Sequence, residues 1–318
     1  MATNKNLLIA IGNIYLDNNI FNVDTGGETH LRVGKDYFAE RSEKVLGGSA
    51  VNFAQQAKNL GLSMAFLGKI GNDDEGKEIK KLLKEKDIIS DLVMTSQEDQ
   101  TSIAFNTIFT GNGEFIGFHW GNASRNLDAD QIDVTNPLFN RAIAVYFGGT
   151  AKQDKVLNKF PMLFQKIHDL GIKIIIDPNR FPVNEQKVKR EILLDSFHYV
   201  ECYLPNEDEI KQVTQKENLD AALEEVLQKG VKVIVVKMGA KGCRIKTKEI
   251  DLLVPGYKVI PTTTVGAGDS FNAGFITQYL EGEPLEVCAK FANACAAIKV
   301  GENNFANYAD VEVFLENF

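Results

Sequence analysis

The 318-residue chain has 35 lysines and arginines against 43 aspartates and glutamates, a formal net charge of −8 at pH 7. This acidic balance argues against a nucleic-acid partner, because a phosphate backbone is usually met by a basic face. With 44% hydrophobic residues, the chain can bury the core of one large α/β domain with a small appendage. It contains no run of about 18 apolar residues, so we expect no membrane span or signal peptide, and a cytoplasmic protein.

Short apolar runs alternate with helical patterns along the chain. The predicted strands, each buried on both faces, are 7–11, 142–147, 172–176 and 231–236. Helices are predicted over 156–170 and 219–229. This alternation indicates right-handed βαβ units and hence a three-layer α/β sandwich, with a mainly parallel central sheet between helices.

Cysteine and histidine spacing offers no metal site. The four cysteines, at 202, 243, 288 and 295, lack the close pairs of zinc-ribbon or thioredoxin motifs. None of the four histidines shows metal-ligand spacing. The sequence therefore predicts reduced cysteine thiols in the core.

The most informative stretch is Gly266-Ala267-Gly268-Asp269, which is followed by apolar residues at helical spacing. Gly266 to Gly268 should present free backbone N–H groups at a helix N-terminus, where these donors and the helix dipole hold an anion. Asp269 would then reach a hydroxyl that attacks a bound phosphoryl group. The stretch predicts phosphoryl transfer to an alcohol; the alternative is a glycine-rich turn whose aspartate caps the helix.

A second small-residue helix begins after Gly47 and Gly48, with Gly61 as its stop. The two glycines allow a ligand to approach the backbone closely. Asn52, in the first turns of this helix, offers donors and acceptors to hydroxyl groups. We expect these residues to line a binding pocket.

Taken together, the motifs of nearly the whole chain resemble those of the ribokinase-like, or PfkB, family of carbohydrate and nucleoside kinases. The motifs that carry the resemblance are Gly12-Asn13-Ile14-Tyr15-Leu16-Asp17, Gly47-Gly48 with Asn52, Gly68-x-x-Gly71-x-Asp73-x-x-Gly76, Asp177-Pro178-Asn179, Asn206-Glu207-Asp208-Glu209, Lys237-Met238-Gly239-x-x-Gly242, Gly266-Ala267-Gly268-Asp269 and Phe291-Ala292-Asn293-Ala294. The resemblance implies an ATP-dependent, Mg²⁺-requiring transfer of the γ-phosphoryl group to a primary hydroxyl of a sugar.

The same resemblance assigns the chemistry. Asp269 corresponds to the catalytic base, and Gly266, Ala267 and Gly268 correspond to the anion hole. Because the helix dipole favours a charged carboxylate, we expect Asp269 to be a weak base that acts mainly by orienting the hydroxyl. The acceptor-binding residues implied by the family are Asp17, which grips two sugar hydroxyls, and Asn13, Gly47, Gly48 and Asn52.

On the nucleotide side, Asn206 and Glu209 match a motif that organises Mg²⁺, with Glu209 expected to act through water. The same residues also fit a capped helix start with an acidic first turn. The remaining residues that the resemblance places near the nucleotide are Asn179, Lys237, Gly239, Gly242 and Asn293. Thr263 stands where many relatives have an aspartate that helps to hold a monovalent cation, which argues against potassium activation.

Two stretches interrupt the βαβ rhythm. Residues 21–42 are polar and charged, and residues 101–120 have the pattern of a hairpin, with a turn at 110–113. In the light of the resemblance, we expect a single catalytic domain, 1–318, with lid insertions at about 13–44 and 97–121. The lid would exclude water from the reaction. Exposed β edges can pair, so a homodimer through the lid is also predicted.

Three other functions remain open from the sequence. A nucleoside kinase is favoured by the N-terminal motif and by lid aromatics such as His119 and Trp120. A kinase that acts on an already phosphorylated sugar also remains open, because Arg32, Arg41 and Arg125 could bind the second phosphate. A catalytically silent sugar or nucleotide sensor would keep the fold without activity. The sequence does not specify which sugar or nucleoside is the acceptor.

Overall fold

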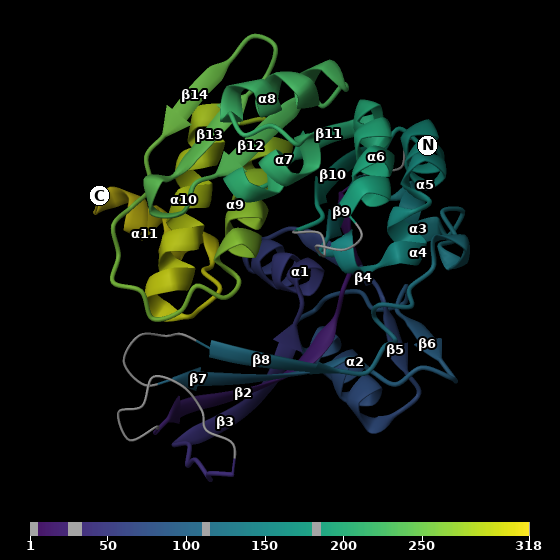
Figure 1. Cartoon of the computed structure of the whole chain (residues 1–318), viewed down its shortest axis with the longest axis vertical. Helices are drawn as coiled ribbons and strands as arrows, with labels where there is room; N and C mark the ends of the chain where they lie inside the picture. The colour runs from purple at the N-terminus through teal and green to yellow at the C-terminus, as the bar shows by residue number, and fades with distance from the viewer. Residues whose placement is uncertain (1–5, 25–33, 110–114, 180–185, 318) are drawn as a thin grey trace.

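An eight-stranded central sheet and a separate four-stranded sheet organise the chain (Figure 1). The computed structural model describes residues 6–24, 34–109, 115–179 and 186–317. The strands of the central sheet, in spatial order, are β14 (Asp251–Val254), β13 (Cys243–Lys246), β12 (Val233–Lys237), β11 (Val200–Tyr203), β10 (Lys173–Asp177), β9 (Ala142–Gly148), β1 (Leu7–Gly12) and β4 (Ser63–Leu67). The strands from β12 to β4 pair in parallel, whereas β13 and β14 join antiparallel. The predicted mainly parallel sheet is confirmed.

Helices cover both faces of this sheet, because successive residues of each strand point to opposite sides. Leu7, Ile9 and Ile11 belong to one buried cluster, and Leu8 and Ala10 to the other. The helices on the first face are α3 (Pro137–Asn140), α4 (Asp154–Leu157), α5 (Phe160–Asp169), α6 (Gln186–Ser196), α7 (Glu207–Thr214) and α8 (Leu219–Gln228). Those on the second are α1 (Ser49–Asn59), α2 (Asp74–Glu85), α9 (Ala267–Glu281) and α10 (Leu285–Glu302), with α11 (Tyr308–Glu316) packed on α10.

One predicted helix is wrong in its extent. The pattern over 156–170 predicts a single helix, whereas the structure divides the region into α4 and α5. Pro161 lies in the first turn of α5, where its missing N–H costs nothing, but it would break a continuous helix. The apolar spacing continues across the break, so periodicity alone could not show it.

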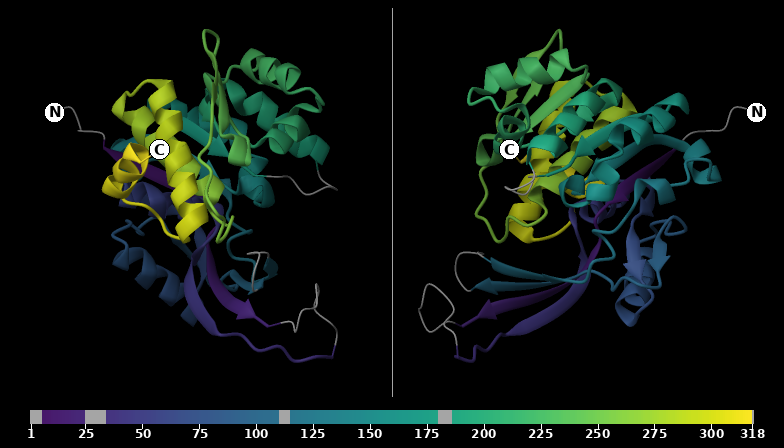
Figure 2. Two further views of the ribbon diagram at one scale, coloured as in Figure 1. Left: turned by 90° about the vertical axis from the view of Figure 1, so that its left-hand side faces the viewer. Right: turned by 45° about the vertical axis from the view of Figure 1, so that its right-hand side comes forward.

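The second sheet stands away from the body (Figure 2). Its strands, in spatial order, are β3 (Arg41–Gly47), β2 (Tyr15–Val23), β7 (Ile103–Phe109) and β8 (Phe115–Trp120). β2, β7 and β8 fall within the two predicted insertions, whereas β3 begins in the first and runs three residues past its predicted end. The predicted turn at 110–113, together with His30 and Arg32, lies outside the described residues.

The glycine-rich run from 68 to 76 connects the lid to the body. Asp73 caps α2 by accepting a hydrogen bond from the Gly76 N–H at 2.8 Å. Its carboxylate also accepts from the N–H of Thr101 at 2.8 Å and from the Thr101 hydroxyl. Thr101 lies two residues before β7, so one carboxylate fixes the root of a lid strand to the start of α2. The remaining short elements are β5 (Lys69–Gly71), β6 (Met94–Ser96), η1 (Ala129–Gln131), η2 (Thr150–Lys152), η4 (Phe197–Tyr199) and η5 (Gly239–Lys241).

The four cysteines are free and buried, which confirms the prediction of reduced core thiols. Within the described ranges, every helix is too short or too polar to cross a bilayer.

Replacing Asp73 with Ala should lower the free energy of unfolding by about 2 kcal/mol, since it removes a helix cap and leaves Thr101 without its acceptor. Urea denaturation measures this change. Asp74→Ala is the matched control, because the Asp74 side chain is 91% exposed and its ion pair is with exposed Lys77. Equal stability of the two variants would contradict the role given to Asp73.

Candidate active site

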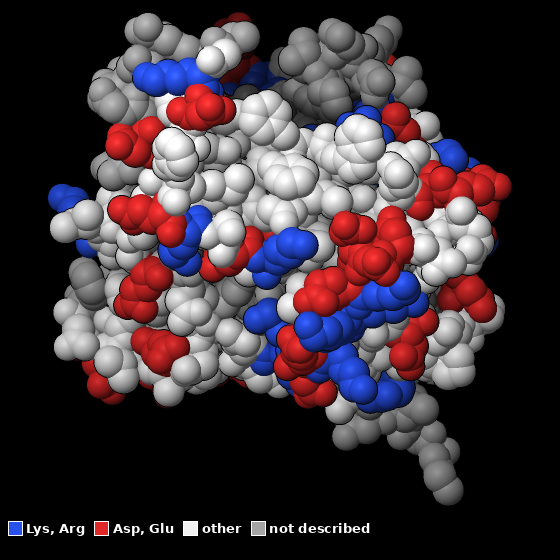
Figure 3. Space-filling view, turned by 90° about the horizontal axis from the view of Figure 1, so that it is seen from below, with Lys and Arg blue, Asp and Glu red and all other residues white. Residues whose placement is uncertain are grey.

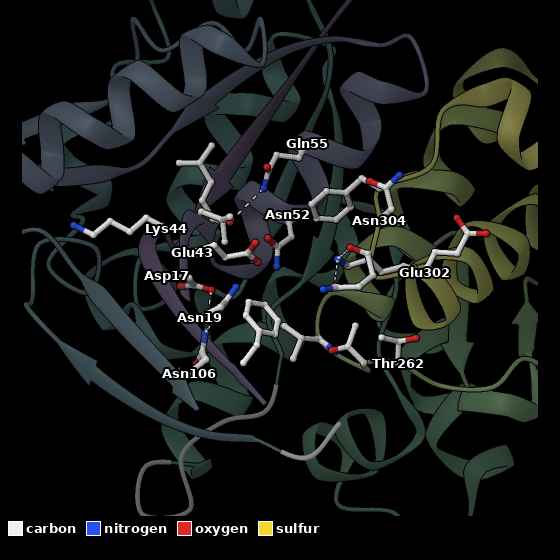
Figure 4. A pocket seen from close by; sticks show the side chains of 18 of the residues that line it. Asp17, Asn19, Glu43, Lys44, Asn52, Gln55, Asn106, Thr262, Glu302 and Asn304 are labelled. Carbon is white, nitrogen blue, oxygen red and sulfur yellow. Dashed lines mark hydrogen bonds between the residues drawn. The ribbon is translucent and has the colours of Figure 1, made fainter. Parts of the chain in front are cut away.

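A cleft of 950 Å³ separates the lid sheet from the body (Figure 4). Its lid wall carries Asp17, Asn19 and Glu43 from β2 and β3, and Asn106 from β7. The body wall is formed by α1, by the loop before α9 and by the C-terminal end of α10. Figure 4 shows side chains from both walls pointing into the space between them.

Asp269 lies in the first turn of α9, beside Asn52, which lines the cleft. Its Oδ1 accepts a hydrogen bond from the Ser49 hydroxyl at 2.6 Å, and its Oδ2 accepts from the Asn52 side-chain amide at 3.0 Å. Ser49 and Asn52 are both on α1, so two helices that are far apart in sequence fix this carboxylate. The orientation of the Asp269 side chain is therefore set before any ligand arrives.

The acidity of Asp269 differs from the prediction. We expected the helix dipole to keep it a weak base, but burial raises the pKa of Asp269 to about 6. The hydrogen bonds from Ser49 and Asn52 and the charge of Lys237 oppose this rise, whereas the charge of Asp177 adds to it. The expectation was wrong because it counted the helix terminus and not the loss of solvent around the side chain.

The loop before Asp269 has the geometry of an anion site. Gly266 caps α9 in the left-handed conformation, at φ 78°, which a glycine adopts without strain. The Ala267 N–H donates to the Thr264 carbonyl at 3.3 Å, so it is already partly engaged. Among the described residues, no backbone partner is recorded for the N–H of Gly266 or Gly268. Two of the three predicted donors thus stand available for an anion.

Two lysines flank this loop. A Cβ on Gly268 would lie 3.7 Å from the Lys237 Nζ, and one on Gly266 would lie 3.2 Å from the Lys299 Cε. Lys299 is only 8% exposed, donates to Asn303 and packs its ammonium over the Phe305 ring. Desolvation lowers the pKa of Lys299, while the charges of Asp269 and Glu43 oppose that shift. The glycine loop is therefore placed between two cationic side chains.

Lys237 is held by a buried polar network beneath the loop. Its Nζ donates to the Asp177 carboxylate at 2.5 Å and to the Asn272 Oδ1 at 3.2 Å. The Asn272 amide donates in turn to Asp177 at 2.6 Å and to the Tyr146 hydroxyl at 3.1 Å. Asp177 and Lys237 end β10 and β12, so the parallel sheet brings together the carboxyl ends that the sequence pointed to.

Asp17 belongs to the lid strand β2 and lines the cleft. A Cβ on Gly47 would lie 2.0 Å from the Asp17 carboxyl group, so the paired strand β3 must have a glycine there. Burial raises the pKa of Asp17 to about 7, partly offset by a hydrogen bond from Asn106. The structure thus brings Asp17 and Gly47 together as predicted, with Asn106 as a neighbour that the sequence did not single out.

Asn13 and Gly48 shape the start of α1. The Asn13 Oδ1 accepts from the Ala50 N–H at 3.3 Å, so it serves the helix N-terminus. Gly48 caps α1 at φ 103°, and a Cβ there would lie 2.8 Å from the Asn13 carbonyl oxygen. Their contacts support the backbone of the pocket; acceptor binding by these two residues stays a prediction.

Asn206 and Glu209 form a reciprocal capping box at the start of α7. The Asn206 side chain accepts from the Glu209 N–H, and the Glu209 carboxylate accepts from the Asn206 N–H, both at 2.8 Å. The structure therefore shows the capped helix start that the sequence offered as a second interpretation of these residues. Across the described ranges, no group of three or more His, Cys, Asp or Glu side chains could cage a metal ion.

The other residues predicted near the nucleotide have structural partners. Asn179 adopts a left-handed conformation, and its N–H and side-chain amide both donate to Asp177. Gly239 and Gly242 make the tight turn between β12 and β13. Asn293 is buried and donates to the Val254 and Pro255 carbonyls. These contacts do not test nucleotide binding.

Sequence reasoning missed four residues of this region. They are Ser49, Asn106, Asn272 and Lys299. Ser49 directly follows Gly47-Gly48, and Asn272 comes three residues after Asp269, so their positions next to these motifs could have identified them. Asn106 and Lys299 had no such signal, because only the folded chain brings β7 and the end of α10 to the cleft.

The sequence model described as pfkB family carbohydrate kinase matches residues 22–310. The chain belongs to this family of carbohydrate kinases. It is 27% identical over 308 residues to Fructokinase-2 of Oryza sativa subsp. japonica, covering 93% of this chain and 89% of the relative. It is 24% identical to the ribokinase of Haemophilus influenzae, covering 84% and 85%. Its fold matches that of an E. coli protein solved in complex with ATP and Mg²⁺, with a TM-score of 0.84 at 19% identity, covering 98% of this chain and 99% of that one.

The role expected of Asp269 gives its pKa a kinetic consequence. A base must be deprotonated, and a carboxylate accepts hydrogen bonds from hydroxyls best when it is charged, so kcat/KM should fall as the pH drops through about 7 and about 6, where Asp17 and Asp269 become protonated. Ser49→Ala removes a hydrogen bond that lowers the pKa of Asp269, so the limb near pH 6 should move to higher pH. The pH profile of kcat/KM measures the shift. Ser42→Ala, at an exposed serine, is the control. The same pH profile of kcat/KM in both variants would contradict the effect of the Ser49 hydrogen bond on Asp269.

Proposed function

We propose that the protein transfers the γ-phosphoryl group of Mg²⁺-ATP to a primary hydroxyl of a sugar, with Asp269 as the base. The observation that carries the proposal is the Asp269 carboxylate, fixed by Ser49 and Asn52 beside the glycine loop. A pKa near 6 leaves this carboxylate deprotonated at neutral pH and more basic than an ordinary aspartate. A nucleoside acceptor is not favoured, because the sequence relatives are described as fructokinases and a ribokinase.

In the proposed step, the acceptor oxygen forms a bond to the γ-phosphorus as the bond to the β-γ bridging oxygen breaks. The hydroxyl proton passes to Asp269, and the products are a sugar phosphate ester and ADP. Asp269 first orients the hydroxyl, and the N–H groups of Gly266 and Gly268 stabilise charge on the transferred phosphoryl group. Lys237 and Lys299 add positive charge on either side of the loop.

The residues near α7 fit a hydrated Mg²⁺ that is held mainly by ATP. Glu209 is 8% exposed and already serves the capping box, so we place it in contact with the ion through water. When bound, Mg²⁺ would neutralise charge on the phosphate oxygens. Asn206, Asn179, Gly239, Gly242 and Asn293 remain our candidates for the nucleotide side.

Asp269→Asn is the decisive test. ADP release with Mg²⁺-ATP and a sugar should fall by at least about 10²-fold, because the variant lacks the proton acceptor. Nucleotide affinity should persist, and it is measured by titration calorimetry. An unchanged rate would reject Asp269 as the base. If the wild-type protein binds ATP but releases no ADP with any sugar, the sensor alternative is favoured.

We also propose a homodimer through the outer face of the lid. Asn18 pairs with Phe105, and Phe105 pairs with Phe118, so these aromatics lie on the face opposite Asp17. Phe118 is 59% exposed and Trp120 61%. Viewed from the lid side, uncharged surface occupies the middle of the molecule between charged side chains (Figure 3). Burying this surface against a second copy would remove apolar area from water.

Sedimentation tests the dimer. The wild-type chain of 35.2 kDa should sediment as a dimer, and Phe118→Asp should sediment as a monomer. Val313→Asp is the control, because Val313 on α11 is equally exposed, at 58%, and lies away from the lid. A monomeric wild-type protein would dispose of the proposal.

We further infer a cytoplasmic protein without a nucleic-acid partner. The support is the formal charge of −8 and the four buried free thiols, which suit a reducing compartment.

Thr263 uses its hydroxyl to accept from the Val265 N–H at 3.2 Å. We propose that catalysis does not require a monovalent cation.

A further inference from the structure

Three basic side chains converge where the lid meets the body. They are His119 near the end of β8, Arg125 in the following loop and Lys152 in η2. Buried hydrogen bonds bring their backbones together. The Ser124 hydroxyl accepts from the Ile14 N–H at 3.0 Å, and the Ser124 carbonyl accepts from the Gln153 side chain at 2.7 Å. Arg125 and Lys152 therefore flank a fixed junction between distant parts of the chain.

This cluster borders the predicted acceptor pocket. Asp17 pairs with Ala104, and Ala104 pairs with His119, so His119 lies on the cleft-facing side of the lid sheet. The Tyr15 ring, two residues before Asp17, contacts the His119 ring with centroids 5.4 Å apart. His119 thus lies two strands away from Asp17 in the lid sheet, on the β8 side, whereas Glu43 on β3 lies on the other side of Asp17.

A second link runs through the body. Gly149, which caps η2, lies so close to Asn13 that a Cβ there would be 2.5 Å from the Asn13 side chain. Lys152 is the last residue of η2. The turn that carries this lysine therefore touches a residue of the predicted acceptor pocket directly.

The cluster lacks a counter-charge in the described part of the chain. Neither Arg125 nor Lys152 forms an ion pair or a side-chain hydrogen bond with any described residue. The acidic side chains closest in sequence are engaged elsewhere: Asp128 and Asp130 with Lys159, and Asp154 with Lys189. Desolvation lowers the pKa of His119, and the charges of Lys152 and Arg125 lower it further. In a chain of net charge −8, Arg125 and Lys152 are therefore a local excess of positive charge beside the His119 imidazole.

We propose that His119, Arg125 and Lys152 form an anion subsite, and that the preferred acceptor is a sugar carrying a carboxylate or phosphate group. The proposal rests on the proposed kinase function and names the substrate class of that same site. Asp17 would hold hydroxyls in the middle of the acceptor, its primary hydroxyl would face Asp269, and its anionic end would lie on the three bases. Arg125 can bind either group through two parallel hydrogen bonds, and Lys152 adds a point charge.

The test compares acceptors of the same class with and without the charge. ADP release is measured with Mg²⁺-ATP and D-fructose or D-ribose as neutral sugars, 2-keto-3-deoxygluconate as the carboxylate, and fructose 6-phosphate as the phosphate. We expect kcat/KM for one charged acceptor to exceed that for both neutral sugars by about tenfold or more, a difference of about 1.4 kcal/mol. Which charged acceptor is preferred identifies the group that the subsite binds.

Charge removal then tests the residues. The double variant Arg125→Gln, Lys152→Gln should raise KM for the preferred charged acceptor by about tenfold or more, with a smaller change in kcat. Arg125→Lys keeps the charge but loses the planar guanidinium group. Its KM should lie between those of the wild-type protein and the double variant. Lys166→Gln, at an exposed lysine on α5, is the matched control for lost charge, and thermal midpoints confirm that each variant is folded.

The outcomes separate the two proposals. In one outcome, the wild-type protein turns over sugars in a reaction that Asp269→Asn abolishes and yet shows no preference for a charged acceptor. If the double variant also leaves the ratio of kcat/KM for charged and neutral acceptors unchanged, the subsite is overturned and the proposed kinase function stands. No turnover of any acceptor by the wild-type protein overturns the proposed function, and the subsite with it. A KM increase of the same size in Lys166→Gln would overturn the assignment to Arg125 and Lys152.

Discussion

The contact on which the site depends is the double hydrogen bond from α1 to the Asp269 carboxylate. Ser49 and Asn52 lie about 220 positions before Asp269 in the chain, yet both donate to it. This contact joins the N-terminal ends of α1 and α9, which pack against the same face of the central sheet. It fixes the carboxylate proposed as the base, and it also fixes the glycine loop relative to the double-glycine turn at the start of α1.

Burial gives the same carboxylate its chemistry. A solvated aspartate is a poor proton acceptor, and removing solvent makes its charged form less favourable. Three groups limit this effect here, namely the donors Ser49 and Asn52 and the cation Lys237. The result is a pKa near 6, which keeps the group charged at neutral pH while leaving it basic enough for the proton transfer that we propose.

The lid and the body divide the remaining tasks. The body supplies the proposed base, the glycine loop and the two flanking lysines, all at the ends of packed strands and helices. The lid supplies Asp17, Asn106 and His119 on its inner face, held at the root by the Asp73 contacts to Thr101. In the proposed reaction, catalysis relies on the packed elements of the body, while the choice of acceptor depends on a sheet that stands apart from them.

The sequence by itself determined the parallel α/β core, the glycine loop with Asp269 and the family, because these depend on local periodicity and on short motifs. It could not determine the division between α4 and α5, since the apolar spacing runs across Pro161. Only the tertiary structure decided the partners of Asp269 and the convergence of His119, Arg125 and Lys152. Pairing between distant segments fixes which side chains share a desolvated space, and that space sets both the acidity of Asp269 and the charge around the acceptor.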